Sequence, residues 1–581
     1  MRTTWRVRRV LHPVMPRPFV LHPACALALA GALSAQAWLP SSPFPSWGNN
    51  PGNVTLLAWD PAKTSAQNGA ALENLAENLQ PGATLSVGPG VWTVSNRFDL
   101  SIVASASQPV RIVATNPTNR PIITRPNASQ NCLNVGSNGP CRYLVLQNLE
   151  FTGGGDLLRI YDGSHVWVDG CYLHDGNGVG IAVQTNSCNH LHLTRNEVAR
   201  PGPGTPGEGM YLGGNFGSIQ VTDSVVAYNH VHDLRGAIVG QGDGIELKQA
   251  STRNWILGNR VHGCRNPCIL VYGTGGIDEN VLDGNFCYDG DDAILQVQGE
   301  AIVRNNVAIG GSAAFQSHDH QGTSSRLQVV HNTFVSAGRA ATLARWGGRA
   351  GMVLANNVMY STNSYSVWFG IGDAGVTTAG NLLFGPGNQT GAGYAMGGGL
   401  GDFVHVDLMS FSIDARPRLG SPIDNRGHPH FQLATDQAGA PRLYPADPGA
   451  LTNSSALQAN VFVVSTGGGT QQLQLDLGVP YRGASYTIVA AARTTTSGFA
   501  TAGFHLPIEL DGLFVLSASG GLANTLQNGI GVLDANGRAS AAVLVPPVGP
   551  ALSGLSVAMS AFVVQNGQLV HVSNPVSLTL Q

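Results

Sequence analysis

The chain has 581 residues, only 11% of them charged, and its formal net charge at pH 7 is -3. The charged fraction lies well below the roughly 25% of typical soluble domains, and the near-neutral balance excludes a broad basic surface for nucleic acid. The sequence has no uninterrupted apolar run near the 18 or more residues of a membrane helix, which excludes a helical membrane span.

Residues 1–37 are predicted to be an export signal. Four arginines lie among the first nine residues, the apolar run ACALALAGALSA follows, and the small-residue site Ala35-Gln36-Ala37 ends the segment. This order is typical of a signal peptide. We therefore expect a secreted or cell-surface protein.

Seven cysteines follow the predicted signal. In an oxidising compartment we expect Cys132 to pair first with Cys141, because they flank a short loop that contains Gly and Pro, and Cys287 is a candidate free thiol. The chain contains no CxxC pair, which argues against a cysteine-ligated zinc site.

Residues 54–449 are predicted to form one domain that begins with a helix. Ala71, Leu72, Leu75 and Leu79 share one helical face, and Pro81-Gly82 ends the helix before a strand. Such a helix can cover the unpaired backbone groups at the open end of a stack of strands.

A loose repeat begins near residue 140. An asparagine followed closely by an apolar residue recurs at Asn148, Asn196, Asn229, Asn259, Asn285, Asn306, Asn332, Asn357 and Asn381. Gly170 takes the corresponding place between the first two, so that the spacings run from 21 to 33 residues. The segments between them alternate at period two, which indicates strands and not helices.

Units of this length with two or three short strands and an asparagine at a fixed turn are typical of the coils of a parallel β-helix. The 75 glycines and 33 prolines suit such a turn-rich all-β fold. We expect residues 140–385 to form about ten coils. Ile245, Leu247, Ile269 and Val271 should point into the core, because alternation fixes which residues face inward.

The helix, the turn PGATLSVGPGVW and the following PVRIVATNPTNRPIIT resemble the N-terminal cap of secreted right-handed parallel β-helix proteins, among them the chondroitinase B and alginate lyase family with its pectin-lyase-like fold. The segments LGSPIDN and TDQAGAPRL are similar to the closing coil of that superfamily. The resemblance implies a right-handed, single-stranded parallel β-helix over about residues 54–449.

Residues 450–581 have a different sequence pattern. The segments YTIVAAA, ASAAVLVPPV, GLSVAMSAFVV and VSLTL alternate without the asparagine repeat and are separated by Gly and Asn turns. They predict a small antiparallel β-sandwich, either a sorting or solubility appendage or a carbohydrate-binding module.

The stretch GDGIELK, residues 242–248, carries two carboxylates and a lysine. With Ile245 and Leu247 inward, Glu246 and Lys248 point outward together. Aligning the coils places Glu208 and Asp243 in one column, with Asp292 in the same column two coils later. Carboxylates this close repel one another unless a cation intervenes, and oxygen ligands favour Ca²⁺. The candidate calcium ligands are Glu208, Asp243, Glu246 and Asp292.

The E-x-K strand resembles the region that holds the calcium ligands and the lysine base in the chondroitinase B and alginate lyase family. The resemblance implies a polysaccharide lyase that cleaves a uronic-acid polymer by β-elimination, with Lys248 as base. A neutral amine is needed, and a nearby cation or partial burial shifts the pKa of a lysine in that direction.

The family's arginine acid has no counterpart, because Ile269 to Tyr272 occupy its place. Tyr272 aligns with Lys248 and is the candidate acid, since a phenol can act as a general acid. His318 and Arg345 fall near the same column and complete the predicted catalytic residues, while His320 lies beside them. The predicted substrate contacts are Tyr211, Arg265 and Gln296.

Two alternatives stay open. The segment DGDDAI from Asp289 to Ile294, followed by His318, resembles the paired-aspartate strand of polygalacturonase-type glycoside hydrolases, but the Asn-Thr-Asp and Arg-x-Lys strands of that family are absent. The second alternative is a non-catalytic β-helix that binds glycans or belongs to the cell surface, in which Glu246 and Lys248 serve only solubility. We expect a monomer whose partner is an acidic polysaccharide.

Overall fold

The computed structural model describes residues 38–581 except for 203–206, 237–240, 389–390, 419–420, 441, 443–445, 453–455, 460, 462, 478–480 and 502–503. The predicted signal peptide, residues 1–37, lies outside the described residues. Among the described residues, no helix combines the length and apolar character needed to cross a membrane.

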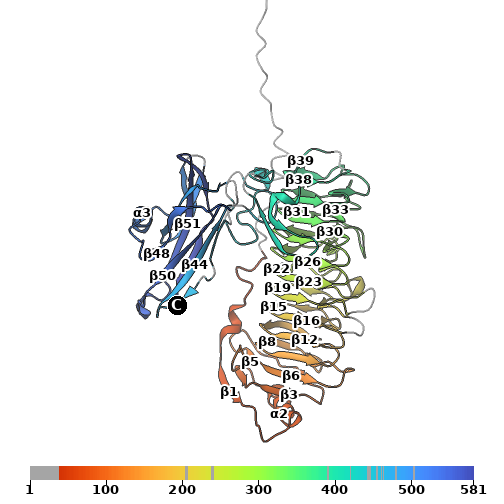
Figure 1. The fold of residues 1–581 in the computed structure, drawn as a ribbon. Helices are drawn as coiled ribbons and strands as arrows, with labels where there is room; N and C mark the ends of the chain where they lie inside the picture. The colour runs from red at the N-terminus through yellow and green to blue at the C-terminus, as the bar shows by residue number, and fades with distance from the viewer. Residues whose placement is uncertain are drawn as a thin grey trace, which may run out of the picture. The chain divides into compact units, whose positions relative to one another are not determined.

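Three parallel sheets make up the stack of coils (Figure 1), and each full coil adds one strand to each sheet. Sheet 1 contains β1 (Asn53–Leu57), β2 (Ala83–Val87), β5 (Val110–Ala114), β8 (Cys141–Gln147), β11 (Gly163–Asp169), β14 (Cys188–Asn189), β15 (His192–Thr194), β18 (Val221–Thr222), β19 (Val225–Ala227), β22 (Trp255–Leu257), β25 (Asn280–Asp283), β28 (Ala301–Arg304), β31 (Leu327–Val330), β34 (Val353–Ala355) and β37 (Thr377–Ala379).

Sheet 2 contains β4 (Asp99–Leu100), β7 (Leu133–Val135), β10 (Leu158–Ile160), β13 (Ile181–Val183), β17 (Met210–Leu212), β21 (Ile245–Leu247), β24 (Ile269–Val271), β27 (Leu295–Val297), β30 (Ala313–Ser317), β33 (Arg339–Leu343) and β36 (Val367–Phe369). Sheet 3 contains β3 (Gly90–Thr93), β6 (Pro121–Arg125), β9 (Glu150–Gly153), β12 (Tyr172–His174), β16 (Glu197–Ala199), β20 (His230–His232), β23 (Arg260–Cys264), β26 (Phe286–Gly290), β29 (Val307–Ile309), β32 (Thr333–Ser336), β35 (Val358–Ser361), β38 (Asn381–Phe384) and β39 (Tyr394–Met396).

The predicted right-handed parallel β-helix is confirmed. Neighbouring coils pair in parallel and in register, as in the run from Met210 through Ile245 to Ile269. Ile245, Leu247, Ile269 and Val271 are all buried in one apolar column. The inward position of these apolar residues fixes the register, because a slip of one residue would turn this column toward water.

The asparagine repeat forms a hydrogen-bonded ladder from Asn196 to Asn381. In each step the backbone N–H and the side-chain amide both donate to the Oδ1 atom of the next asparagine, at 2.8–3.1 Å. The prediction was wrong for Asn148 and Gly170, which lie one residue before the ladder. Cys171 occupies the ladder position instead, and its N–H donates to Asn196.

The error at Asn148 has a conformational cause. Asn148 and Gly170 have φ of 57° and 62°, so they belong to the left-handed position that precedes each ladder residue. Asparagine is tolerated in both positions, since its short amide can bond locally in the left-handed region.

We expect Asn259→Ala to lower the free energy of unfolding by about 1–3 kcal/mol, because it leaves the buried N–H groups of Asn229 without their acceptor. Urea unfolding measures the change. Asn186, which is exposed, provides the control Asn186→Ala, expected to fall within about 0.5 kcal/mol of the parent. Equal stability of the two variants would contradict a stabilising ladder.

A helix, α2 (Ser65–Glu77), lies at the N-terminal end of the stack in Figure 1. Thr64 caps it, and the Thr64 and Gln67 side chains form a capping box, which satisfies backbone N–H groups of its first turn. The predicted apolar face is partly wrong: Leu72 is buried, but Leu75 is 39% exposed. Ala76 is buried instead, so the helix is rotated relative to the predicted stripe.

The segment predicted as a closing coil does not add a coil to the end of the stack. Its described residues bond to the turns of earlier coils: Gln437 donates to the carbonyl oxygens of Gly284 and Asn285, and Arg442 donates to Asn305. It lies along the asparagine edge of the stack, close to short strands β40 (Phe403–Val406) and β41 (Ile413–Pro417) in sequence.

The C-terminal region forms two main sheets that share one apolar cluster, with Leu473, Leu475, Ile488, Ala561 and Val563 among its members. The first sheet contains β42 (Leu457–Ala459), β44 (Gly469–Asp476), β48 (Leu526–Gln527) and β50 (Arg538–Val545). The second contains β43 (Val463–Val464), β45 (Ser485–Ala491), β49 (Ile530–Val532), β51 (Ser556–Gln565), β52 (Gln568–Val572) and β53 (Val576–Leu580). Outside these sheets, β46 (Thr494–Thr501) pairs with β47 (Phe504–Ile508), and helix α3 spans Gly512–Ala518. The pairing is antiparallel except between β43 and β53, as expected for a small sandwich.

The predicted Cys132–Cys141 disulfide is wrong, since the structure has both as buried free thiols, along with the other five cysteines after residue 37. The two residues belong to different sheets, with Cys132 directly before β7 in sheet 2 and Cys141 at the start of β8 in sheet 1. Burial raises the pKa of each thiol to about 12, which keeps it protonated and unreactive.

Candidate active site

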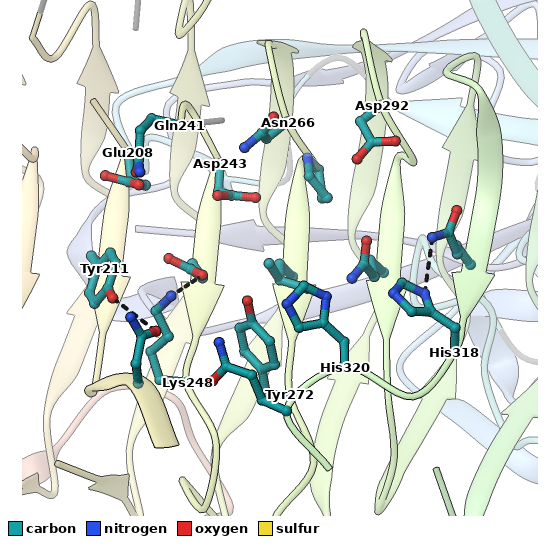
Figure 2. Close-up of a pocket in the computed structure, with 17 residues that line it drawn as sticks. Glu208, Tyr211, Gln241, Asp243, Lys248, Asn266, Tyr272, Asp292, His318 and His320 are labelled. Atoms are coloured by element: carbon teal, nitrogen blue, oxygen red, sulfur yellow. Dashed lines mark hydrogen bonds and ion pairs between the residues drawn. The ribbon is translucent and has the colours of Figure 1, made fainter. Parts of the chain in front are cut away.

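The outward face of sheet 2 carries a groove of about 450 Å³, lined from β17 to β30 and by the turns that precede these strands. Figure 2 shows its side chains arranged along neighbouring strands, with Lys248, Tyr272, His318 and His320 toward one end of the strands and the groups Glu208, Gln241, Asp243, Asn266 and Asp292 toward the other. The strand register determines which of these groups meet.

Three carboxylates converge in the groove. Glu208 and Asp243 each lie two residues before paired positions of β17 and β21, and Glu246 points outward from β21. One oxygen of each lies within 4.8 Å of the others, and the residues are only 1%, 5% and 3% exposed. Each also has a buried oxygen without a hydrogen-bond partner among the described residues.

Burial and mutual repulsion act on these acids. Burial, together with the nearby charge of Glu246, raises the pKa of Glu208 to about 7. Burial and the charges of Glu246 and Glu208 raise the pKa of Asp243 well above its ordinary value, and burial raises that of Glu246 despite its pairing with Lys248. Because Lys248 pairs with Glu246 alone, ionisation of all three acids together is unfavourable without a further cation.

Asp292 does not join the other carboxylates, contrary to prediction. The β24–β27 register places Ala293, and not Asp292, in the column of Asp243. Asp292 is exposed at the margin of the groove, where it accepts a hydrogen bond from Ser312. The turn before β27 carries it one residue out of the column.

Lys248 lies at the base of the groove and is not a solvated surface lysine. It is 5% exposed, its Nζ atom donates to Glu246, and Nζ lies 4.2 Å and 5.2 Å from the ring centroids of Tyr211 and Tyr272. Burial alone would lower the pKa of Lys248, but the charge of Glu246 and the bonds to Glu246 and Tyr211 outweigh burial and raise it. The amine is therefore protonated in this state, whereas a base has to be neutral.

Tyr272 follows β24 in the position that pairs with Lys248. Burial and the charge of Glu246 raise the pKa of its phenol, which stays protonated. The His320 ring contacts the Tyr272 ring edge-on at 5.2 Å, and His318 shares a 3.0 Å hydrogen bond with Gln316. Burial and neighbouring His320 lower the pKa of His318, so this ring is neutral at neutral pH.

The structure places two of the three predicted substrate contacts in the groove. Tyr211 and Gln296 line it on β17 and β27. Arg265 lies in the turn after β23 and donates to the backbone oxygen of Arg235, outside the described lining. Arg345, predicted as catalytic, is exposed and also outside that lining, because it lies one residue beyond the column of His318.

The groove is also lined by amides that the sequence pattern did not predict: Asn215, Gln241, Asn266, Gln316 and Gln321. Gln316 could have been found, because the parallel register puts it directly beside Gln296 on an outward column. The others lie outside the strands, where strand alternation gives no signal.

Of the three aspartates in the hydrolase-like segment DGDDAI, Asp292 lines the groove, whereas Asp289 and Asp291 lie outside its described lining. Asp289 and Asp291 both bind the guanidinium of Arg235, at 2.7 Å and 3.0 Å. This pairing leaves neither of them free to flank a substrate bond.

Part of the chain is similar to a known family. The family model for a right-handed β-helix region matches residues 123–286. No curated protein matches the chain significantly. Among solved structures, an alginate lyase from Paenibacillus sp. str. FPU-7 is 15% identical with a TM-score of 0.30, covering 48% of this chain and 98% of that one.

Two other solved structures are similar at the same distant level. A mannuronic-acid-specific family 6 polysaccharide lyase from human gut microbiota is 12% identical, with a TM-score of 0.38 and coverage of 59% of this chain and 90% of that one. The catalytic domain of a GH87 α-1,3-glucanase in complex with nigerose is 13% identical, with a TM-score of 0.29 and coverage of 61% and 67%. The chemistry of the groove has to be argued from its own residues.

Proposed function

We propose that the groove on sheet 2 binds an acidic, uronic-acid-containing polysaccharide and cleaves it by β-elimination, with Ca²⁺ held by Glu208, Asp243 and Glu246. The observation that carries the proposal is the set of three buried carboxylates with unpartnered oxygens beside a lysine and a tyrosine in one open groove. The predicted export signal agrees with an extracellular polymer as substrate.

The three acids suit a hard cation. Calcium takes several oxygen ligands at about 2.3–2.6 Å, and carboxylates that lie within 4.8 Å of one another can contact one such ion. Bound there, calcium would supply positive charge next to the carboxylate of a uronate residue, which makes the proton on the adjacent carbon easier to remove.

Lys248 is the proposed base. Its pKa is raised because Glu246 holds it as an ion pair, while its burial acts in the opposite direction. If Glu246 binds Ca²⁺, its ion pair with Lys248 is lost. The burial of Lys248 remains and then favours the neutral amine. The amine nitrogen then takes the proton from the carbon beside the uronate carboxylate.

Tyr272 is the proposed acid. Its phenol is protonated and lies beside Lys248 at the groove wall. It donates its proton to the glycosidic oxygen as the bond from that oxygen to the sugar breaks, and the electron pair of the broken C–H bond forms the new double bond of the product.

A glycoside hydrolase is the second candidate, because a buried Glu208 with a pKa of about 7 can act as a general acid near neutral pH. Two observations argue against it. Asp289 and Asp291 are bound to Arg235, and the three groove acids bring one oxygen each within 4.8 Å of the others, an arrangement that suits a shared cation.

A panel of polysaccharides tests the proposal. We expect the protein with Ca²⁺ to release products with the ultraviolet absorbance of an unsaturated uronate from at least one of alginate, polygalacturonate and dermatan sulfate. Neutral α-1,3-glucan is the control and should yield no such product. New reducing ends without this absorbance would show hydrolysis, and binding without either signal would show a non-catalytic glycan-binding protein.

A further inference from the structure

Three histidines gather on the outward face of sheet 3, which is not the sheet of the groove. His230 and His232 project from β20, and His262 projects from β23, where it pairs in register with His232. One ring nitrogen of each lies within 4.8 Å of the others, and the Nε2 atoms of His230 and His262 are 3.0 Å apart.

Two carboxylates orient His232. Its Nδ1 atom lies 3.0 Å from Asp233, and in the tautomer in which this nitrogen donates its proton to the carboxylate, Nε2 keeps a lone pair. That Nε2 lies 3.3 Å from Glu197 on the preceding coil. A lone pair and a carboxylate are both acceptors, so their contact requires a proton or a metal ion between them.

The geometry points to a binding site for one zinc-class divalent transition-metal ion, held by the ring nitrogens of His230, His232 and His262 and completed by the carboxylate of Glu197. Imidazole nitrogen is a ligand that zinc favours, and four ligands of this kind give a tetrahedral site. Zinc–nitrogen bonds of about 2.0–2.1 Å place two nitrogens roughly 3.3 Å apart, close to the 3.0 Å seen here.

The surrounding charges are of both signs. Glu197 and Asp233 are negative, whereas the positive Arg260, in register with His230 on β23, opposes a cation and donates to the hydroxyl of Tyr288. Burial and the neighbouring His230 lower the pKa of His262 to about 4, so its ring is neutral at neutral pH. The ion would join β16, β20 and β23 and so hold three successive coils together.

The absence of CxxC pairs from the sequence bears only on cysteine-ligated sites. These histidines come from two strands about one coil apart, and only the parallel register brings them together. The alternative is a plain stack of rings, since His230 stacks on His232 at 4.2 Å and His262 on Tyr288 at 4.7 Å.

Calorimetric titration of the full chain with ZnCl₂, in excess Ca²⁺ to occupy the groove on sheet 2, tests this site. We expect one zinc per chain and a gain in melting temperature on zinc addition. His230→Ala and His262→Ala should weaken zinc binding at least about 10- to 100-fold. Glu197→Gln keeps all three rings and should also weaken it, which guards against loss of fold in the histidine variants.

His174 is a matched control. Its Nδ1 lies 2.6 Å from Asp175 and its Nε2 lies 3.1 Å from Glu150, the same carboxylate arrangement as at His232, but it stacks on Tyr172 and lies outside the three-histidine cluster. His174→Ala should bind zinc as the parent does. The site is refuted if the parent takes up no zinc, or if the His230 and His262 variants bind zinc as tightly as the parent.

Discussion

Lys248→Ala is expected to lower lyase turnover by about 100- to 10,000-fold, the usual effect of removing a general base. It should also lower the free energy of unfolding by about 3–5 kcal/mol, because it leaves the buried Glu246 without its partner beside two other acids. This second effect differs from the expectation for a solvated surface lysine. Initial rates on the cleaved polysaccharide and urea unfolding measure the two effects.

A double variant separates the two roles of Lys248. Lys248→Met with Glu246→Gln removes both charges, so stability should return toward that of the parent while activity stays lost. The chain has one other lysine, Lys63, which is half-exposed and pairs with Asp60 at the surface. Lys63→Ala should leave both quantities nearly unchanged. Full activity of Lys248→Ala would reject Lys248 as the base.

The fold could be predicted because its determinants are local and repeated. Alternation alone placed Ile245 and Leu247 inside, and the recurring asparagine marked the turn that the ladder occupies. The same signal failed at Asn148 because one turn has two adjacent positions that accept asparagine, and the residue type does not distinguish them. The face of α2 was misjudged because one short helix gives few positions from which to fix its rotation.

Parts of the groove were predictable for the same reason. Parallel strands in register stack equivalent positions of successive coils. Glu208 therefore lies beside Asp243, and Lys248 lies beside Tyr272. Asp292 and Arg345 were misplaced because each lies one residue beyond a strand column, where turn length decides the position.

The sequence around Lys248 does not indicate that this side chain is buried. This burial arises from the Tyr211 and Tyr272 rings of the neighbouring coils, whose side-chain directions the sequence pattern does not give. Its pKa therefore could not be judged from sequence, since the balance between burial and the charge of Glu246 depends on these contacts.

The contribution of Glu208 to the stability of the metal-free protein is expected to fall as the pH rises from about 4.5 to about 7. The folded state raises the pKa of Glu208 from 4.5 to about 7, so between these values the folded chain holds a proton that the unfolded chain releases. The free energy of unfolding of the parent relative to Glu208→Gln then falls with rising pH, by about 3 kcal/mol for a shift of this size. The comparison with Glu208→Gln is needed because partly or fully buried histidines with lowered pKa values act in the opposite direction in both proteins. Urea unfolding across this pH range with a chelator present measures the fall.

Calcium should reverse this loss, because it binds the ionised carboxylates and competes with their protons. At pH 7.5 we expect added Ca²⁺ to raise the melting temperature and chelation to lower it again, with the effect fading toward pH 5. Glu208→Gln should remove the pH-dependent contribution of Glu208 and abolish most of the calcium effect, while Glu279→Gln, outside the groove, should change neither. A calcium effect that persists in Glu208→Gln would place the ion elsewhere, and a metal-free parent that does not lose stability relative to Glu208→Gln over this pH range would contradict the raised pKa of Glu208.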